Sequence, residues 1–131
     1  MLHSSDDATN HLVLSGGLGD GQVNVYDMRT GQVVKAAFVA KAAVNFLQIS
    51  PTNPNLLVTG SADKMLKSFD LRKGEGKNLS RVKQMKAPES ILCGEIVQEG
   101  RVAITGCSDG NIFAFDIDQG GDPLYGFGAE K

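Results

Sequence analysis

Residues 56–70 read Leu-Leu-Val-Thr-Gly-Ser-Ala-Asp-Lys-Met-Leu-Lys-Ser-Phe-Asp, and this stretch decides the fold. Its first six residues are apolar, β-branched or small, which favours a β-strand over 56–61. Residues 62–64 form a short polar break of the kind that tight turns require. Residues 65–70 form a second strand, in which Leu66 is apolar and Lys67 and Ser68 are expected to face outward. The stretch therefore predicts an antiparallel hairpin that ends in an aromatic residue followed by aspartate.

The same hairpin occurs three times along the chain, at a period of roughly 45 residues. Each copy has a small-residue step centred on glycine, a turn aspartate and a closing aromatic-Asp pair. The glycines are Gly16, Gly60 and Gly106, the turn aspartates are Asp20, Asp63 and Asp109, and the pairs are Tyr26-Asp27, Phe69-Asp70 and Phe115-Asp116. Asp-Gly at 20–21 and at 109–110 favours positive φ, as tight hairpin turns require. A period of this length, built from short strands, is typical of propeller blades or a related array.

Further strands flank each hairpin, so each repeat is expected to be a four-stranded antiparallel sheet in an all-β chain. In the second repeat, a strand at 43–50 precedes the hairpin and a polar strand at 81–86 follows it. A polar last strand suits an outer edge, where charge discourages unwanted pairing. We divide the chain into a first blade at 1–38 with a truncated first strand, a second blade at 39–86 and a third blade at 87–131.

An arc of three blades is expected to leave two apolar faces uncovered, because each blade buries its faces against its neighbours. Closed rings usually contain about four to eight blades. We therefore expect the 131 residues to be a portion of a longer propeller, whose remaining blades come from the parent chain or from another subunit. The first repeat carries one extra residue, for which we expect a bulge or a wider turn near Leu18 and Gly19.

The composition limits the classes of function. A net charge of −2 argues against a chain-wide nucleic-acid or membrane role, so we expect no membrane partner and consider nucleic acid unfavoured. Cys93 and Cys107 are too few for a disulfide framework and are expected to be buried, reduced thiols. There is no secretory leader pattern and no long apolar run, so we expect a cytoplasmic protein, with a nuclear or a ciliary or cytoskeletal location as alternatives.

At these motifs the chain resembles the WD-repeat β-propeller family over nearly its whole length. The three aromatic-Asp pairs stand where that family has Trp-Asp, and the turn aspartates and Ser/Thr-Gly steps match its pattern. The chain departs from the family in having no Trp and in lacking the Gly-His pair, whose place is taken by Val39-Ala40 and by Ala87-Pro88. Because that histidine is absent, we expect backbone N–H groups to hold the turn aspartates. The resemblance implies a non-catalytic protein–protein interaction scaffold within a multiprotein complex.

Signals for an enzyme are weak. His3 and His11 are the histidines of the chain, and no Cys/His spacing suits zinc. The glycine-rich segment 16–21 has the composition of a phosphate cradle, but a strand follows it rather than a helix, so turn chemistry explains it better. We expect no catalytic residue, no cofactor and no metal site.

One motif suggests a specific docking role. Residues 57–72 end in Phe-Asp-Leu-Arg and are similar to the sixteen-residue box of WD-repeat substrate receptors for cullin–RING ubiquitin ligases, and residues 26–29 end the preceding repeat in the same way. The resemblance implies that Arg29 and Arg72 would present planar donor groups to carboxylates on an adaptor. The alternative is that each arginine is only a solvent-exposed residue of its turn and recruits no ligase.

Two surfaces are further candidates for contact with partner proteins. Between residues 64 and 86 basic side chains outnumber acidic ones, which fits an acidic protein, tubulin-like tails or phosphates, or else a charged outer strand that avoids unwanted pairing. In a propeller, the turns between second and third strands share one rim with the fourth-to-first connections. The candidate contact residues there are Leu18, Lys41, Lys64, Pro88, Glu89 and Ser108. The identity of the partner proteins is left open, and a structural component of a cilium or cytoskeletal array is the alternative to the scaffold and ligase interpretations.

Overall fold

The computed structural model of the chain describes residues 2–4, 12–16, 20–53, 55–73, 76, 78–97, 100–121 and 123–127. Over these ranges the chain forms twelve β-strands and no helix, so the all-β prediction is confirmed. The strands make three four-stranded antiparallel sheets, each in sequence order. The first sheet contains β1 (Leu2–Ser4), β2 (Leu12–Gly16), β3 (Gln22–Asp27) and β4 (Gln32–Phe38). The second contains β5 (Val44–Ile49), β6 (Leu56–Ser61), β7 (Met65–Asp70) and β8 (Ser80–Lys86), and the third contains β9 (Ile91–Val97), β10 (Val102–Cys107), β11 (Ile112–Asp116) and β12 (Tyr125–Phe127).

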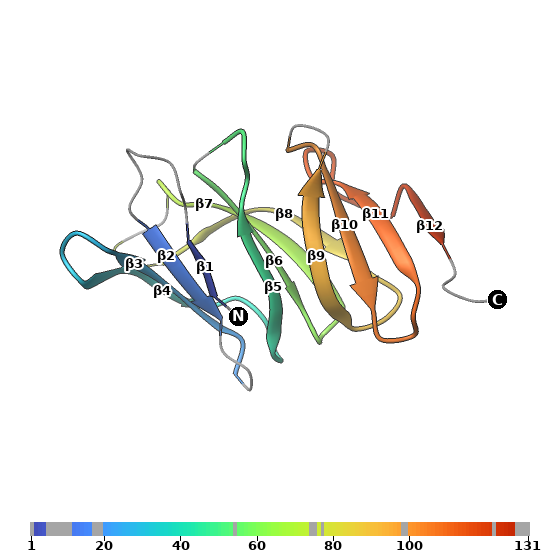
Figure 1. Cartoon of the computed structure of the whole chain (residues 1–131), viewed down its shortest axis with the longest axis horizontal. Helices are drawn as coiled ribbons and strands as arrows, with labels where there is room; N and C mark the ends of the chain where they lie inside the picture. The colour runs from blue at the N-terminus through green and yellow to red at the C-terminus, as the bar shows by residue number, and fades with distance from the viewer. Residues whose placement is uncertain are drawn as a thin grey trace.

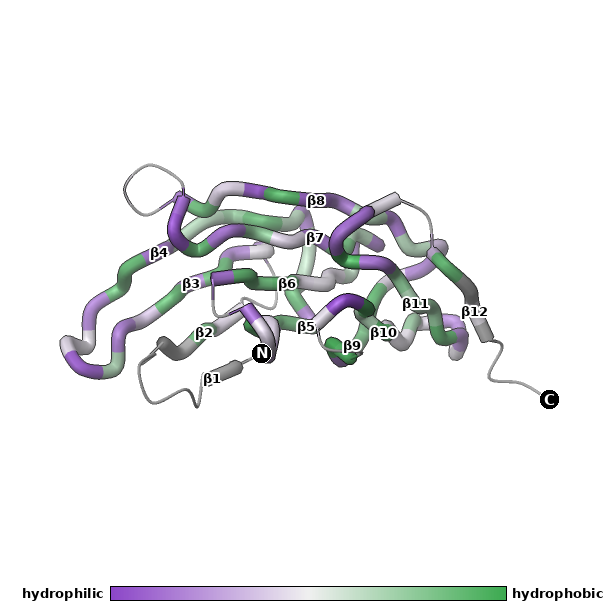
Figure 2. Tube along the Cα trace, turned by 90° about the horizontal axis from the view of Figure 1, so that it is seen from above, coloured by the Kyte–Doolittle hydropathy of each residue, from purple (hydrophilic) through white to green (hydrophobic). Residues whose placement is uncertain are grey.

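The three sheets stand side by side in chain order, as Figure 1 shows. The first strands of the sheets lie along one side of the arc, where β5 contacts both β1 and β9, while β4 and β8 lie along the opposite side (Figure 2). This radial layering is that of propeller blades. None of the described residues belongs to a helix that could cross a membrane.

The central hairpin of each sheet is set by its turn. β6 and β7 pair from Leu56 opposite Asp70 to Gly60 opposite Leu66. Gly21 and Gly110 have φ of 73° and 86°, as expected for their Asp-Gly turns, and Lys64 takes the equivalent place in the second sheet with φ of 76°. A non-glycine residue is strained in this left-handed region, so Lys64 is held there by the hairpin on both sides of it.

Two separate cores fill the two gaps between neighbouring sheets. The core between the first and second sheets consists of Leu14, Val23, Val25, Val39, Val44, Leu47, Ile49, Leu57 and Phe69. The core between the second and third sheets consists of Phe46, Val58, Leu66, Met85, Ala87, Ile91, Ile96, Ala103, Cys107, Phe115 and Ile117. Alternate residues of the middle sheet therefore serve different cores, as the period of a strand dictates.

The ring of Phe46 fits against two glycines. It is 2% exposed, and it lies between Gly60 of its own sheet and Gly94 of the third sheet. A Cβ added at Gly94 would lie 2.8 to 2.9 Å from three atoms of the ring, and one added at Gly60 would lie 3.3 Å from the Phe46 Cβ and Cδ2. The second and third sheets can approach this closely because neither position carries a side chain.

Two expectations about individual side chains were wrong. Ser68 does not face outward, since it is fully buried and its Oγ accepts the backbone N–H of Lys83 at 3.1 Å. Cys107 is buried as expected, but Cys93 is exposed, because it lies on the face of the third sheet that no described sheet covers. The expected bulge at Leu18 and Gly19 lies outside the described residues, as does His11.

Candidate functional site

The candidate contact residues predicted from the sequence lie in turns and connections along one rim of the arc. Ser90 Oγ donates to Ala62 O at 2.7 Å, and Ser108 N donates to Ser90 O at 2.9 Å, so successive turns are joined by hydrogen bonds. On this rim Lys41, Pro88 and Ser108 are exposed, Lys64 and Glu89 are half-buried, and Leu18 lies outside the described residues. These residues form a band along the arc rather than one compact site.

The turn aspartates accept hydrogen bonds from backbone N–H groups, as expected in the absence of the family's histidine. Asp20 Oδ1 accepts from Gln22 N at 3.1 Å, and Asp109 Oδ1 accepts from Asn111 N at 3.0 Å. The shared role of these aspartates is therefore structural, because each carboxylate closes its own hairpin.

Asp63 is held more firmly than the other two turn aspartates. Its Oδ2 accepts from Lys41 N at 3.0 Å, and its Oδ1 accepts from Met65 N at 3.1 Å and from the Ser61 hydroxyl. Burial raises the pKa of Asp63, but these hydrogen bonds and the nearby charge of Lys67 together hold it below its ordinary value. Asp63 thus ties the β4–β5 connection to the β6–β7 turn.

The opposite rim carries the two Asp-x-Arg motifs, and their geometry is the same. Asp27 Oδ1 accepts from Arg29 N at 2.9 Å and lies 3.5 Å from its Nε, and Asp70 repeats both distances with Arg72. The hydrogen bond from the Arg72 backbone, partly opposed by desolvation, lowers the pKa of Asp70. The side chains of Arg29 and Arg72 are 66% and 65% exposed. Each guanidinium group therefore contacts the aspartate of its own turn and remains exposed to solvent.

The third sheet does not carry this motif. Asp116 Oδ1 accepts instead from the backbone N–H groups of Asp118 and Gln119, at 2.9 and 3.0 Å. An acidic residue therefore stands where the first two sheets present arginine, and the Asp-x-Arg motif occurs in two of the three repeats.

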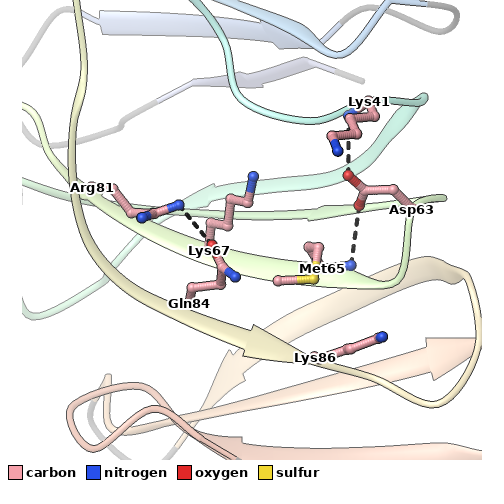
Figure 3. A pocket seen from close by; sticks show the side chains of 7 residues that line it. All are labelled: Lys41, Asp63, Met65, Lys67, Arg81, Gln84 and Lys86. Carbon is pink, nitrogen blue, oxygen red and sulfur yellow. Dashed lines mark hydrogen bonds between the residues drawn. The ribbon is translucent and has the colours of Figure 1, made fainter.

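A hollow of about 400 Å³ lies on the side of the second sheet that faces the first. It is shown in Figure 3, where Lys67 comes from β7, and Arg81, Gln84 and Lys86 come from β8. We name this hollow the basic groove, and its lining residues are Lys41, Asp63, Met65, Lys67, Arg81, Gln84 and Lys86.

A β-bulge assembles the basic groove. In the pairing of β7 with β8, Ser68 lies opposite Lys83 but Phe69 lies opposite Arg81, so Val82 is an extra residue in β8. The extra residue reverses the facing of side chains beyond it. Arg81 therefore lies on the same side as Gln84, and its Nη1 donates to Gln84 Oε1 at 2.7 Å.

Sequence reasoning named Lys41 as a contact residue but not the other members of the groove. Lys67, Arg81 and Lys86 were visible only as part of a basic stretch, because simple alternation would place Arg81 with Lys83. Lys83 instead lies on the other side of β8, where its Cδ would lie 3.4 Å from a Cβ added at Gly120. Within the described part of the chain, no three His, Cys, Asp or Glu side chains come together as a metal site.

Comparison with known proteins agrees with this architecture. The family model described as "WD domain, G-beta repeat" matches residues 33–70. The DNA damage-binding protein CMR1 of Phaeosphaeria nodorum is 37% identical over 82 residues, which are 62% of this chain and 15% of that protein. The U5 small nuclear ribonucleoprotein 40 kDa protein of Dictyostelium discoideum is 29% identical over 106 residues, 81% of this chain and 28% of that protein.

A third relative is the WD-40 repeat-containing protein MSI3 of Arabidopsis thaliana, 37% identical over 54 residues, which are 41% of this chain and 13% of that protein. The chain therefore spans less than a third of the length of each of these curated relatives. The match at 33–70 covers β4 to β7 almost entirely, including the β6–β7 hairpin of residues 56–70. Residues 33–70 therefore match the WD-repeat family model, and the three stacked four-stranded sheets have the architecture of WD-repeat propeller blades.

Proposed function

We propose that the chain is a non-catalytic scaffold that binds other proteins through its rims within a larger assembly. The observation that carries the proposal is the rim itself. Lys41, Pro88 and Ser108 are exposed there, in the β4–β5 connection, the β8–β9 connection and the β10–β11 turn, and hydrogen bonds hold these segments in place. Rigid scaffolds that present loop residues are a common basis for protein recognition. One similar protein is named as a component of the U5 small nuclear ribonucleoprotein, which favours a role in an assembly and a nuclear location over a cytoplasmic one.

Cross-linking of the purified assembly with mass spectrometry tests this proposal. We expect cross-links between partner proteins and the rim lysines Lys41 and Lys64. A chain that is isolated from its own cells without stoichiometric partners would contradict a scaffold role.

We further propose that blades 1–38, 39–86 and 87–131 belong to a ring that other blades close. The support comes from the uncovered face of the third sheet, which has a shallow hollow of about 240 Å³ lined by Cys93, Gly94, Glu95, Ile104, Gly106 and Ile112. Ile112 is 41% exposed and Leu92 is 52% exposed, so apolar surface is available to a further sheet. In the closed ring, Cys93 should become resistant to maleimide labelling. Equal labelling rates in the isolated chain and in the assembly would refute closure at this face.

Docking to a ubiquitin-ligase adaptor is a second candidate, because Arg29 and Arg72 repeat one geometry with open guanidinium groups. The paired variant R29A/R72A should lose recovery of the adaptor, whereas R101A, which removes an exposed arginine outside either motif, should retain it. If the adaptor is recovered equally with all three proteins, the motifs serve only their turns.

A further inference from the structure

The lining of the basic groove carries more positive than negative charge. Four of its lining residues are basic, namely Lys41, Lys67, Arg81 and Lys86, and one is acidic. None of the four cations forms an ion pair with any residue that the structure describes. The acidic member, Asp63, is engaged by two backbone N–H groups and a hydroxyl, so it offers little compensation to an incoming anion.

One cation of the groove is held by a hydrogen bond, and three other lining residues follow one another along an exposed strand. Lys67 Nζ donates to Val39 O at 2.6 Å, which holds its positive charge in the gap between the first two sheets. Arg81, Gln84 and Lys86 are exposed along β8. Because β8 is extended, the Cα atoms of Arg81 and Lys86 are separated by roughly 15 Å. The basic side chains of β8 are therefore attached at points spread along the strand.

We infer that the basic groove binds an extended acidic segment of a partner protein, with several carboxylates spaced along β8. A single phosphate group would contact both Arg81 and Lys86 only if these two long side chains turned toward each other. Alternate carboxylates of an extended peptide lie on one side of it, about 7 Å apart, and so match positive charges spaced along a strand. The lining contains no aromatic side chain on which a nucleic-acid base could stack. This inference rests on the proposed scaffold function and assigns to it one surface and one chemistry of partner.

The location of the groove makes it available in the closed ring as well. It lies between the first and second sheets, and both sheets are present in this chain. Additional blades would cover the outer face of the first or the third sheet and would leave this gap unchanged. The groove thus differs from the uncovered apolar faces, which are occupied once the ring is complete.

The test uses the full chain and a fluorescein-labelled hexaglutamate peptide, followed by fluorescence anisotropy. R81E/K86E reverses two exposed charges of the groove, and K73E/K83E is the matched control, since it reverses two exposed charges outside the groove. We expect R81E/K86E to weaken binding about tenfold and K73E/K83E to weaken it less than about twofold, because close charges act most strongly and distant ones are screened. Binding of the wild-type chain should also fall as salt is raised.

Other outcomes would overturn the inference. Equal losses in both paired variants would mean that hexaglutamate senses only the overall charge of the chain. Displacement of hexaglutamate by inorganic phosphate at equal total charge would identify a single-anion site. Groove-dependent binding of a single-stranded oligonucleotide that is tighter than that of hexaglutamate would identify a nucleic-acid site. Failure of hexaglutamate to bind while partners are still cross-linked to Lys64, which lies outside the groove, would reject the groove and keep the scaffold. Groove-dependent binding without any stoichiometric partner would reject the scaffold and keep the groove.

Discussion

The fit of Phe46 against Gly94 predicts a strong coupling between these two positions. A methyl group at Gly94 would come within 2.8 Å of a ring that is 2% exposed, whereas carbon atoms in contact prefer about 3.5 to 4.0 Å. The ring or the third sheet must then move by roughly 1 Å, and overpacking of this kind costs about 1–3 kcal/mol of unfolding free energy. For a chain of this length, each kcal/mol corresponds to a shift of about 4 °C in Tm.

A double-mutant cycle isolates that cost. F46L removes the ring and should lower the unfolding free energy by about 1–2 kcal/mol. In the F46L background, G94A should cost less than about 0.5 kcal/mol, which gives a coupling energy of about 1–2 kcal/mol. The measurement is urea unfolding followed by far-UV circular dichroism. L14A serves as the control background, because Leu14 belongs to the other core and should combine additively with G94A. If G94A costs the same with Phe46 and with Leu at position 46, the close approach of the sheets is not what requires glycine.

Four further predictions concern single side chains. D63N should lower the free energy of unfolding by about 1–2 kcal/mol near neutral pH, since an amide nitrogen cannot accept from the N–H donors around it. Because the folded-state pKa of Asp63 is lowered, the urea midpoint of the wild type should approach that of D63N as pH falls through that pKa. A constant difference between the two midpoints down to acid pH would contradict this. K64G should raise stability by about 0.5–1 kcal/mol by relieving a φ of 76°, as read from the urea midpoint, and an unchanged or lower midpoint would argue against strain there. Lys35 Nζ donates to three carbonyl oxygens of the β7–β8 connection, those of Lys73, Gly76 and Asn78. K35M should therefore speed proteolysis within 71–79, whereas cleavage at the wild-type rate would show that the ammonium does not hold this connection. Iodoacetamide should modify Cys93 well before Cys107, whose pKa is raised by burial, and faster modification of Cys107 would place it at the surface.

The fold could be predicted from the sequence because its signals are local. β6 and β7 begin and end where the pattern of residues 56–70 places them, since the hairpin is determined by its own turn and by β-branched residues. Positive φ at Gly21 and Gly110 follows from Asp-Gly in the same way. These features need no knowledge of the neighbouring sheet.

The features that depend on neighbours could not be predicted. Ser68 is buried because the third sheet covers its face, although its own strand pattern does not show this. Arg81 joins the basic groove because of a bulge at Val82, and the residue pattern of β8 does not predict this bulge. Lys67 and Lys41 come together only when the β4–β5 connection closes over the second sheet. The sequence thus shows which side chains are basic or polar, but which residues they contact depends on how the sheets stack.

Because each gap between neighbouring sheets holds its own core, the sheets are not expected to unfold in the same way. Loss of an outer sheet abolishes one core and leaves the other intact, whereas loss of the middle sheet abolishes both. The two ends are therefore expected to open independently and at moderate free-energy cost, while the centre opens only together with everything else, as in linear repeat arrays with nearest-neighbour coupling. Amide hydrogens of β6 and β7 should exchange the slowest in the molecule.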